Sequence, residues 1–359
     1  MKKYTIKRQL TAVIFLILAV MMTSAKDEEF TKRYKKEYEA GKDTKLQIEN
    51  KYGNIDIKNW DKNLISVEVI VTVSTSNEDK ARKLFDQVDI EFAESGNTIS
   101  VKTSFESDFS KFFKGSGDKL VDIYYSVNMP KDIRLDLSNK YGNVFINELT
   151  STSNIDIKYG NLKANRIIHS DEQPLTRIML AYSNSKIQQC AWVKLDIKYS
   201  KVEMDVSKAL VFLSRYSKVF ITKGSSLVAE SKYDTYRLGT FTNLVATAGY
   251  SNFKAEEISD KIFMETKYTD LNVDFVPSGF ESIKINTGYG NYSVIIDPNA
   301  SYKLEGYAKY ARISYPDNSR VNRYNENNEM RVEGLIGSDQ NTGSTVHISS
   351  DYGNIKLTK

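Results

Sequence analysis

Hydrophobic and polar residues alternate along most of this chain with the period of two that is typical of β-strands. The pattern is clearest over residues 195–206, where apolar side chains stand at 195, 197 and 199, skip one position, and resume at 202, 204 and 206. Such alternation places one face of a strand in a core. A shift by one residue marks a bend or bulge that keeps the same side inward. The pattern predicts two short strands joined at Ser200-Lys201, with Tyr199 and Val206 in phase with the buried side.

The same corner recurs along the chain, each time centred on a tyrosine. From Tyr141 to Tyr289 successive corners are 18, 23, 17, 17, 17, 17, 18 and 21 residues apart. A unit of this length cannot bury its apolar face alone, so the copies must stack, each pairing its backbone with the next at about 4.8 Å. We therefore expect an all-β fold, a single-chain stacked β-solenoid or β-helix. The corner tyrosines are Tyr52, Tyr141, Tyr159, Tyr182, Tyr199, Tyr216, Tyr233, Tyr250, Tyr268, Tyr289 and Tyr352.

These corner tyrosines are the candidate functional residues, and they have two interpretations, one structural and one as a binding surface. Equivalent rings in a stack would form a structural ladder, with the Asn residues that follow them hydrogen-bonding along the axis. Alternatively, an exposed row of rigid aromatic side chains would bind sugar or peptide. The structural interpretation is favoured because each tyrosine shares the phase of the apolar residues before it. Glycine and asparagine tolerate positive φ, but Ser200-Lys201 and Ser217-Lys218 in the same places indicate that the corner does not demand it throughout.

Residues 44–137 differ from the regular run at 138–359, and we expect them to form an N-terminal β region that caps the open end of the stack. Strands are expected at 46–57, 64–73, 88–92, 98–103 and 121–128. Ser76-Asn77-Glu78-Asp79 has the pattern of a capping box and predicts one short helix, with Ala81, Leu84, Phe85 and Val88 at helical spacing. Residues 105–117, with Phe105, Phe109, Phe112 and Phe113, are expected to be a loop that packs on the solenoid end or binds a partner.

The first 25 residues have the pattern of a secretory signal peptide. A basic start precedes an apolar run from Leu10 to Met22, which is followed by the small residues Thr23-Ser24-Ala25. The run is shorter than the roughly 20 residues that span a membrane, so we expect cleavage and no transmembrane segment afterwards. Residues 26–43 are dense in mixed charge and are expected to be a solvated tail or linker. The protein is therefore expected to be exported to the periplasm, the cell surface or the outer membrane.

Charge and residue usage argue against several classes of function. The four basic residues of the leader account for the formal charge of +4: subtracting them from 50 Lys and Arg leaves 46, against 46 Asp and Glu. This balance argues against nucleic acid as the main partner. Cys190 has no partner for an internal disulfide and is expected to be a small buried hydrophobic residue. His169 and His347 lie far apart without a nucleophile motif. Asp317, Asn318, Asn325 and Asn327 lack calcium-loop spacing.

The corner motifs also resemble a known family. Residues 52–57 (Tyr-Gly-Asn-Ile-Asp-Ile) with Trp60, residues 125–130 leading to 135–144, and residues 334–338 before the last corner are similar to the bacterial putative-adhesin family, described as auto-transporter adhesin head domains (GIN-type). The resemblance implies an exported β-solenoid and adhesion or surface display, and it supplies no catalytic residues or cofactor.

Three functions follow as hypotheses. The first is a non-catalytic, adhesin-like envelope protein that binds glycan or a surface protein. The second is a structural or envelope-stress-linked periplasmic component without a specific ligand. The third is a carbohydrate-active β-helix enzyme, which the short 17- to 18-residue coils disfavour because they leave little length for loops to wall a cleft.

Overall fold

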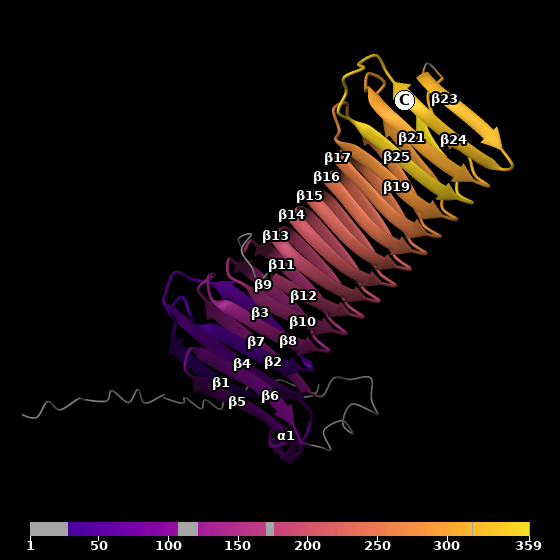
Figure 1. Ribbon diagram of the computed structural model, residues 1–359. Coiled ribbons are helices and arrows are strands. Elements are labelled where there is room, and N and C mark those ends of the chain that lie inside the picture. Colours follow the sequence, from indigo (N-terminus) through magenta and orange to yellow (C-terminus); the bar gives the residue numbers. More distant parts are fainter. Residues whose placement is uncertain (1–27, 107–120, 170–175, 318, 359) are drawn as a thin grey trace, which may run out of the picture. The chain divides into compact units, whose positions relative to one another are not determined.

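The computed structural model describes residues 28–106, 121–169, 176–317 and 319–358 (Figure 1). The expected signal peptide and Phe109, Phe112 and Phe113 lie outside these residues. The chain forms two compact units, one ending at Asn147 and the other beginning at Glu148. Both are built from β-strands, and the described part of the chain contains one helix, of eight residues. No helix in the described ranges has the length and apolar character needed to cross a membrane.

The first unit contains one helix and most of the N-terminal strands. Its elements are β1 (Glu29–Glu39), β2 (Lys45–Lys51), β3 (Gly53–Asn59), β4 (Leu64–Ser74), α1 (Glu78–Phe85), β5 (Val88–Ser95), β6 (Thr98–Phe105), β7 (Val121–Met129) and β8 (Arg134–Lys140), and β9 (Val144–Leu149) contains the boundary.

The second unit consists of strands alone. They are β10 (Ser153–Lys158), β11 (Asn161–Ile167), β12 (Thr176–Ala181), β13 (Asn184–Lys198), β14 (Lys201–Arg215), β15 (Lys218–Lys232), β16 (Thr235–Gly249), β17 (Asn252–Lys267), β18 (Asp270–Val276), β19 (Ser282–Gly288), β20 (Tyr292–Ile296), β21 (Tyr302–Lys309), β22 (Ile313–Ser314), β23 (Ser319–Glu326), β24 (Glu329–Ile336), β25 (Thr345–Asp351) and β26 (Ile355–Thr358).

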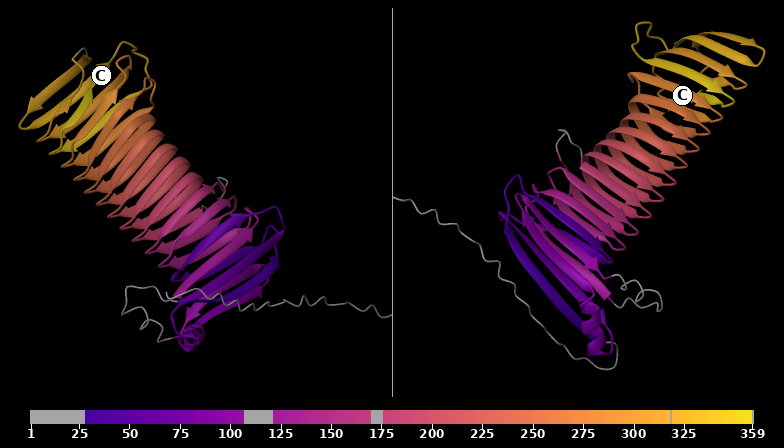
Figure 2. Two further views of the ribbon diagram at one scale, coloured as in Figure 1. Left: turned by 180° about the vertical axis from the view of Figure 1, so that it is seen from behind. Right: turned by 60° about the horizontal axis from the view of Figure 1, so that its bottom comes forward.

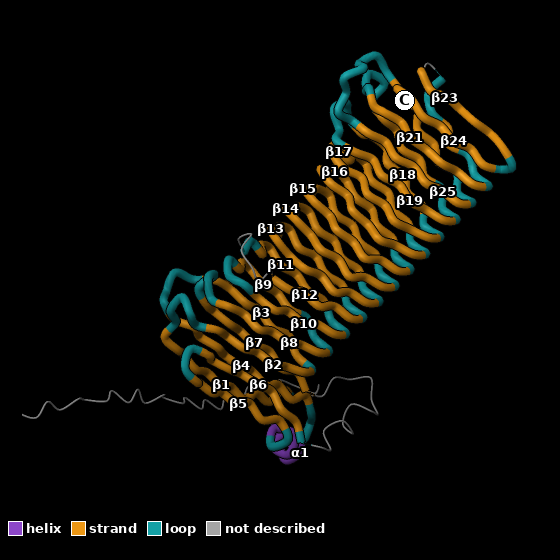
Figure 3. Tube along the Cα trace, in the orientation of Figure 1, coloured by secondary structure: helices purple, strands orange, loops and turns teal. Residues whose placement is uncertain are grey.

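The expected solenoid is confirmed, and its most regular part is β13–β17. Each strand pairs in parallel with the next, and from β13 to β16 the partner of every residue lies 17 positions further on, as Asn184 opposite Lys201 shows. A coil comprises the strand segment before a tyrosine, which we assign to sheet A, and the segment after it, which we assign to sheet B. Figure 2 shows these strands stacked, and Figure 3 shows the tyrosine corners as a row of turns along one edge of the second unit.

The core lies between sheets A and B. Phe212 of sheet A meets Tyr236 of sheet B edge to face, with ring centroids 5.9 Å apart. Buried tyrosines of sheet B satisfy their hydroxyls on sheet A, as in Ser214–Tyr236 at 2.6 Å and Thr266–Tyr292 at 2.5 Å. Because buried polar atoms without partners are costly, these bonds fix where the two sheets meet.

Cys190 is buried as expected. It is 3 % exposed, its sulfur lies 3.1 Å from that of Met204, and burial raises the pKa of its thiol to about 12. A thiol in this environment stays protonated at neutral pH and packs as a small apolar group.

Val206 is a correction to the sequence pattern. Its side chain is 44 % exposed, and the next residue, Ser207, is buried instead. Two consecutive exposed residues, Asp205 and Val206, mark a second bend in the coil, opposite the tyrosine corner. The register is the same before and after this bend, with Met204 opposite Ile187 and Ser207 opposite Cys190, so the strand continues while its inward phase shifts by one.

The last coil in the sequence is not the last in the stack. β25 lies between β19 and β21, parallel to both, and β26 pairs with both β20 and β22. The outer edge carries an antiparallel hairpin instead, since β24 pairs with β21 and β23 with β24. Strands β25 and β26 are therefore held between two other coils.

The first unit shows the same arrangement. The first coil in sequence, β2–β3, lies between the coil β6–β7 and the coil β8–β9. Antiparallel strands cover the outer edge, because β4 pairs with β7, β1 with β4, and β5 with β6. The edge strands carry many charges, which discourages pairing with another chain.

The expectation for residues 26–43 is wrong over the described part, since β1 occupies residues 29–39. Phe30, Tyr34 and Tyr38 fall on its half-buried face, and burial raises the pKa of Tyr38 to about 12. Register with β4 supplies backbone hydrogen bonds along the full strand. Aromatic residues at every fourth position lie on one face of this strand, but the lysines between them made the segment look uniformly polar. A lysine can occupy such a face because its aliphatic stem covers apolar surface while its charge stays in water.

The expected strands at 46–57, 64–73, 88–92, 98–103 and 121–128 are present, the first interrupted at Tyr52. The predicted helix is also present, but its N-cap is Asn77 rather than Ser76. The Asn77 side chain accepts a hydrogen bond from the backbone N–H of Lys80 at 3.0 Å, which satisfies one of the free donors at a helix start. Val88 begins β5 instead of extending the helix.

Excision of one internal coil should preserve the stack. Removing Tyr199–Arg215 joins Lys198 to Tyr216 and brings β13 beside β15 in unchanged register, because both interfaces use the same 17-residue offset. We expect a cooperative urea transition and retained β signal in circular dichroism. Some stability is lost, since Ser214 leaves its bond to Asp234. Complete loss of the β signal would contradict the stacked architecture.

Candidate functional site

The predicted corner tyrosines form an aromatic ladder. In the second unit ten rings stack in the order 159, 182, 199, 216, 233, 250, 268, 289, 352 and 310, with centroids 4.7–5.0 Å apart and planes within 19°. In the first unit Tyr52 stacks on Tyr141 at 5.2 Å and meets Phe105 edge to face. Tyr352 stands between Tyr289 and Tyr310, as the insertion of β25 and β26 requires.

Tyr310 is a ladder member that sequence reasoning missed. It has the same positive φ and stacking as the others. It is followed by Ala311-Arg312 rather than by a small polar pair, so the motif did not reveal it. The signal available was the preceding alternation at Tyr302, Leu304 and Gly306, which matches that of the other coils.

The tyrosines are not inward, which corrects the sequence-based phase. In the second unit the ladder rings are 41–52 % exposed, and all eleven predicted corner tyrosines have φ between 49° and 65°. A left-handed residue turns its side chain away from the alternation, and the next residue takes the buried place, as Ser200 does at 6 % exposure. The sequence led to the opposite interpretation because period-two counting assumes extended backbone at every position.

The glycines that follow some corner tyrosines serve close packing rather than positive φ. A Cβ at Gly142 would lie 1.8 Å from the carbonyl oxygen of Gly53, and one at Gly353 would lie 2.0 Å from that of Gly290. Neither glycine has positive φ. At these corners the adjacent coils approach too closely for any side chain.

Where the corner has serine or threonine, a buried hydroxyl ladder replaces the glycines. The Ser200 hydroxyl donates to the carbonyl of Lys198 at 2.7 Å and accepts the backbone N–H of Ser183 at 3.2 Å. Ser217 repeats both bonds one coil on. Each hydroxyl thus closes its own corner and holds the neighbouring one.

Asp234 occupies one position of this hydroxyl ladder and is only 3 % exposed. Its carboxylate accepts from the hydroxyls of Ser214 and Ser231 at 2.7 and 2.8 Å, and from the backbone N–H groups of Ser217 and Lys232 at 2.7 and 3.0 Å. Burial raises its pKa above the ordinary value, and these hydrogen bonds oppose the rise. Its four partners are groups of the protein core.

Asparagines two positions after the tyrosine form hydrogen bonds to the neighbouring coil in both units. The Asn54 side chain accepts from the Asn143 backbone at 2.9 Å, the Asn161 side chain accepts from the amide of Asn184 at 3.1 Å, and the Asn354 side chain accepts from the Arg312 backbone at 3.0 Å. In the middle of the second unit Lys201 and Lys218 take the equivalent position.

The ladder presents ring edges and hydroxyls rather than ring faces. Neighbouring rings are nearly parallel and less than 5.1 Å apart in the second unit, so each interior ring covers part of the next. Within the ladder, therefore, no ring face is open for a sugar to stack on. What remains accessible is a row of phenol hydroxyls, one for each coil.

Positive φ at a non-glycine residue costs roughly 1–2 kcal/mol, and an aromatic pair contributes about 0.5–1.5 kcal/mol. Stacking and strain are thus of similar size at each corner. We expect Tyr216→Phe to leave the free energy of unfolding nearly unchanged and Tyr216→Ala to lower it by about 1–3 kcal/mol. Tyr216→Gly should be less damaging than alanine, because glycine accepts positive φ. Urea denaturation measures all three, and alanine more stable than glycine would contradict strain at this corner.

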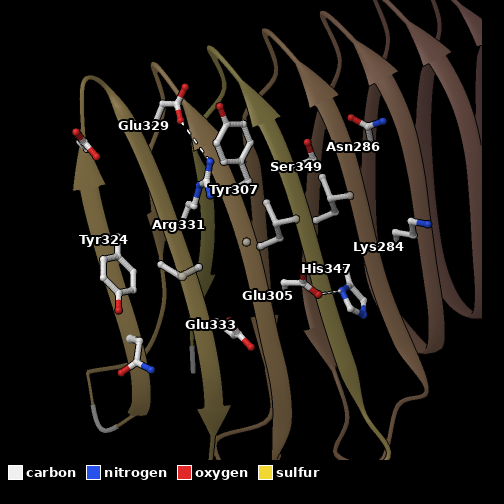
Figure 4. Close-up of a pocket in the computed structure, with 16 residues that line it drawn as sticks. Lys284, Asn286, Glu305, Tyr307, Tyr324, Glu329, Arg331, Glu333, His347 and Ser349 are labelled. Atoms are coloured by element: carbon white, nitrogen blue, oxygen red, sulfur yellow. Dashed lines mark hydrogen bonds and ion pairs between the residues drawn. The ribbon is translucent and has the colours of Figure 1, made fainter.

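A second candidate surface lies on sheet A, over β19, β21, β23, β24 and β25. A hollow of about 1010 Å³ is lined there by Glu305, Tyr307, Tyr324, Arg331 and His347, among other residues. Figure 4 shows these side chains standing on neighbouring strands. His347 lies 3.1 Å from Glu305, Arg331 lies over the Tyr307 ring at 5.6 Å, and Tyr324 is 71 % exposed.

Among the described residues, the side chains of this hollow that bear on catalysis are Tyr307 and the His347–Glu305 pair. Desolvation is the main cause that raises the pKa of Tyr307, and a hydrogen bond with Glu329 raises it further. No bond links the His347–Glu305 pair to a hydroxyl or thiol in the part of the chain that is described. His169 lies elsewhere, bonded to Thr152 at 3.1 Å. Within the described ranges, no group of three His, Cys, Asp or Glu side chains is arranged to hold a metal ion.

Comparisons with known proteins give a distant likeness. No family model matches the sequence, and no curated protein matches it. Among solved structures, a "putative cell adhesion protein" from Clostridium sporogenes is 12 % identical with a TM-score of 0.21, covering 91 % of this chain and 99 % of its own. A "putative adhesin" from Parabacteroides merdae is 8 % identical with a TM-score of 0.31, covering 91 % and 96 %. Another, from Parabacteroides distasonis, is 12 % identical with a TM-score of 0.28, covering 90 % and 96 %. Similarity at this level assigns no function to this chain.

Proposed function

We propose that this protein is a non-catalytic, exported, adhesin-like envelope protein that binds glycan or a surface protein through the hollow on sheet A. The observation that carries the proposal is the exposed aromatic and charged lining of that hollow. Tyr324 and Tyr307 offer rigid rings with polar tips, a combination suited to recognition because little side-chain entropy is lost on binding.

The charges of the hollow favour a polar ligand. Glu305, Glu329 and Glu333 alternate with Arg331 and His347 across neighbouring strands. The Arg331–Glu329 and His347–Glu305 pairs are solvent-exposed, so they exchange partners at little cost. A ligand with hydroxyl or amide groups meets both donors and acceptors here.

The rigid sheet beneath the hollow supports binding without rearrangement. Val332, Ile336 and Ile348 anchor its strands in the core at 5 % exposure or less. Side chains on paired strands are more precisely placed than those on loops. The hollow is open to solvent, and strands β21, β24 and β23, which pair side by side, supply most of its lining.

The test is a broad array of glycans and host-matrix proteins probed with the chain that begins at Lys26. We expect saturable binding that Tyr324→Ala weakens. Phe275→Ala, which removes an exposed ring on β18 outside the hollow, is the matched control and should bind like the unmodified protein. Equal loss in both variants, or no saturable binding at all, would contradict the proposal and favour a structural envelope component. Product release from bacterial or plant polysaccharides would favour an enzyme instead.

Export belongs to the same proposal and has its own measurement. We expect the protein recovered from the envelope fraction to have the mass of a chain beginning at Lys26. An intact leader on protein recovered from the cytoplasm would count against it.

A further inference from the structure

Cations are concentrated at three consecutive corners in the middle of the second unit. The residue before the tyrosine is Lys198, Arg215 or Lys232, and the residue two after it is Lys201 or Lys218 at the first two of these corners. We call these five residues, with Tyr199, Tyr216 and Tyr233, the basic corner segment. The corners on either side, at Tyr182 and Tyr250, have alanine or glycine before the ring and asparagine after it.

The register of the strands places these cations in two columns. Lys198, Arg215 and Lys232 are direct neighbours on sheet A, and Lys201 is opposite Lys218 on sheet B. The Tyr199, Tyr216 and Tyr233 rings run between the columns with centroids 4.8–4.9 Å apart. The segment is a strip of phenol hydroxyls with positive charge on both sides.

Four of the five cations have no acidic partner among the described residues. No ion pair there involves Lys198, Arg215, Lys218 or Lys232, whereas Lys201 pairs with Glu203 and lies over the Phe220 ring. The Lys232 Nζ lies 5.5 Å from the centroid of the Tyr233 ring, so the positive charge of this lysine is next to the tyrosine ladder. Nearby Asp196 is paired with Arg177. Asp196 and the exposed Glu230 are the acidic residues that line the groove beside the sheet A column, and Glu203 stands next to Lys201 on sheet B.

The sheet A column borders a groove of about 360 Å³. Lys198, Arg215 and Lys232 line it with Leu213 and Thr247, and Gly249 leaves it open at the next coil. Like charges placed side by side repel each other, so three neighbouring cations without counter-charges lower stability slightly. A ligand that supplies negative charge along this line would remove that repulsion.

The geometry points to a linear acidic polysaccharide as the ligand of the basic corner segment. One sugar unit of an extended polysaccharide advances the chain by about the distance between coils, so carboxylate or sulfate groups can meet successive cations. The phenol hydroxyls donate to oxyanions and sugar hydroxyls between them. Nucleic acid fits less well, because single strands bind by base stacking on open aromatic faces, and neighbouring rings cover the faces here.

This site is separate from the hollow over β21 and β24, so each can fail while the other holds. The experiment measures binding of the full chain to immobilised dextran sulfate against neutral dextran, and to polygalacturonate against its methyl ester. We expect binding to both charged polymers only, weakened by raising salt from 50 to 500 mM, because exposed charges are screened. The quadruple variant Lys198→Gln/Arg215→Gln/Lys218→Gln/Lys232→Gln should bind at least about tenfold more weakly.

The matched control is Lys186→Gln/Lys208→Gln/Lys223→Gln/Lys303→Gln, which removes the same net charge from exposed positions away from the tyrosine corners. It should retain affinity within about twofold. Equal weakening in both quadruple variants, or equal binding to charged and neutral polymers, would overturn the proposal. Tighter binding of a single-stranded oligonucleotide than of either charged polysaccharide would overturn it in favour of nucleic acid. Thermal melts of both variants should show the cooperative transition of the unmodified protein, which checks that they are folded.

Discussion

Removing residues 339–359 is expected to destabilise the whole C-terminal end of the stack rather than shorten it by one coil. This deletion takes away β25 and β26, which pair on both sides with other coils. It also removes Tyr352 from between Tyr289 and Tyr310 in the ladder. The coil β21–β22 and the β23–β24 hairpin lose their attachment to β19 and β20.

The expected loss is large compared with ordinary protein stability. Val346, Ile348, Ile355 and Leu357 are at most 5 % exposed. At about 1.5–3 kcal/mol for each buried aliphatic side chain, their removal costs roughly 6–12 kcal/mol, while whole domains are stable by about 5–15 kcal/mol. Hydrogen exchange followed by mass spectrometry should show loss of protection over β21–β24, with protection kept in β13–β16.

The coil excision at Tyr199–Arg215 is the control for this truncation. It removes a similar length of chain, yet leaves the flanking strands β13 and β15 each with a neighbour on both sides. We expect the internal excision to be the milder change. Unchanged protection of β21–β24 after the C-terminal truncation would show that these strands do not depend on the inserted coil.

Replacement of Asp234 should have the second-largest effect, and its direction depends on the substitute. Asp234→Ala leaves the hydroxyls of Ser214 and Ser231 and the N–H groups of Ser217 and Lys232 without their acceptor. We expect this variant to lose about 3–5 kcal/mol of its free energy of unfolding, because the buried groups that bonded to Asp234 are left without hydrogen-bond partners. Asp234→Ser should match or exceed the natural protein, since serine at the equivalent corners accepts one N–H and donates to a carbonyl.

The same carboxylate gives the protein a pH dependence of defined sign. Because burial raises the folded-state pKa of Asp234 above its ordinary value of 3.8, the folded protein holds the proton more tightly than the unfolded chain does. The contribution of Asp234 to stability is therefore full below pH 3.8 and falls as pH rises toward the folded-state pKa. The stability gain of Asp234→Ser over the natural protein should accordingly grow over this window and then level off.

Urea denaturation of both proteins from pH 3 to pH 7 measures this difference. Comparing the two removes the contributions of the other carboxyl groups, which both proteins share. A gain that shrinks with rising pH would mean that the hydrogen bonds to Asp234, rather than its burial, dominate its pKa.

Several features of the fold could be predicted because they are local. Alternation at 195 and 197, and again at 202 and 204, gave the strands and their buried faces, and the 17-residue spacing gave the stacking. Cys190 was correctly expected to be buried, although only one of its two register neighbours, Ile167, is apolar and the other is Ser207. The helix was found from its polar start and apolar spacing, with an error of one residue at the N-cap.

The candidate sites were less predictable, because each depends on residues brought together from distant coils. The basic corner segment is visible only when positions 17 residues apart are aligned in register. The hollow on sheet A combines Glu305 of β21, Arg331 of β24 and His347 of β25. These residues meet because β21 lies between the antiparallel β24 and the inserted β25.

By itself the sequence determined that this chain is a stack of tyrosine-cornered β coils, because period-two alternation and a fixed repeat length leave little choice of local structure. The tertiary structure alone decided that the tyrosines face outward and that the first coil and the last coil in the sequence each lie between two other coils. Outward rings follow from a left-handed backbone at the corner, which a pattern of residue types does not encode. The inserted coils follow from pairing between distant strands, whose energy depends on which edges remain unpaired once the other coils have formed.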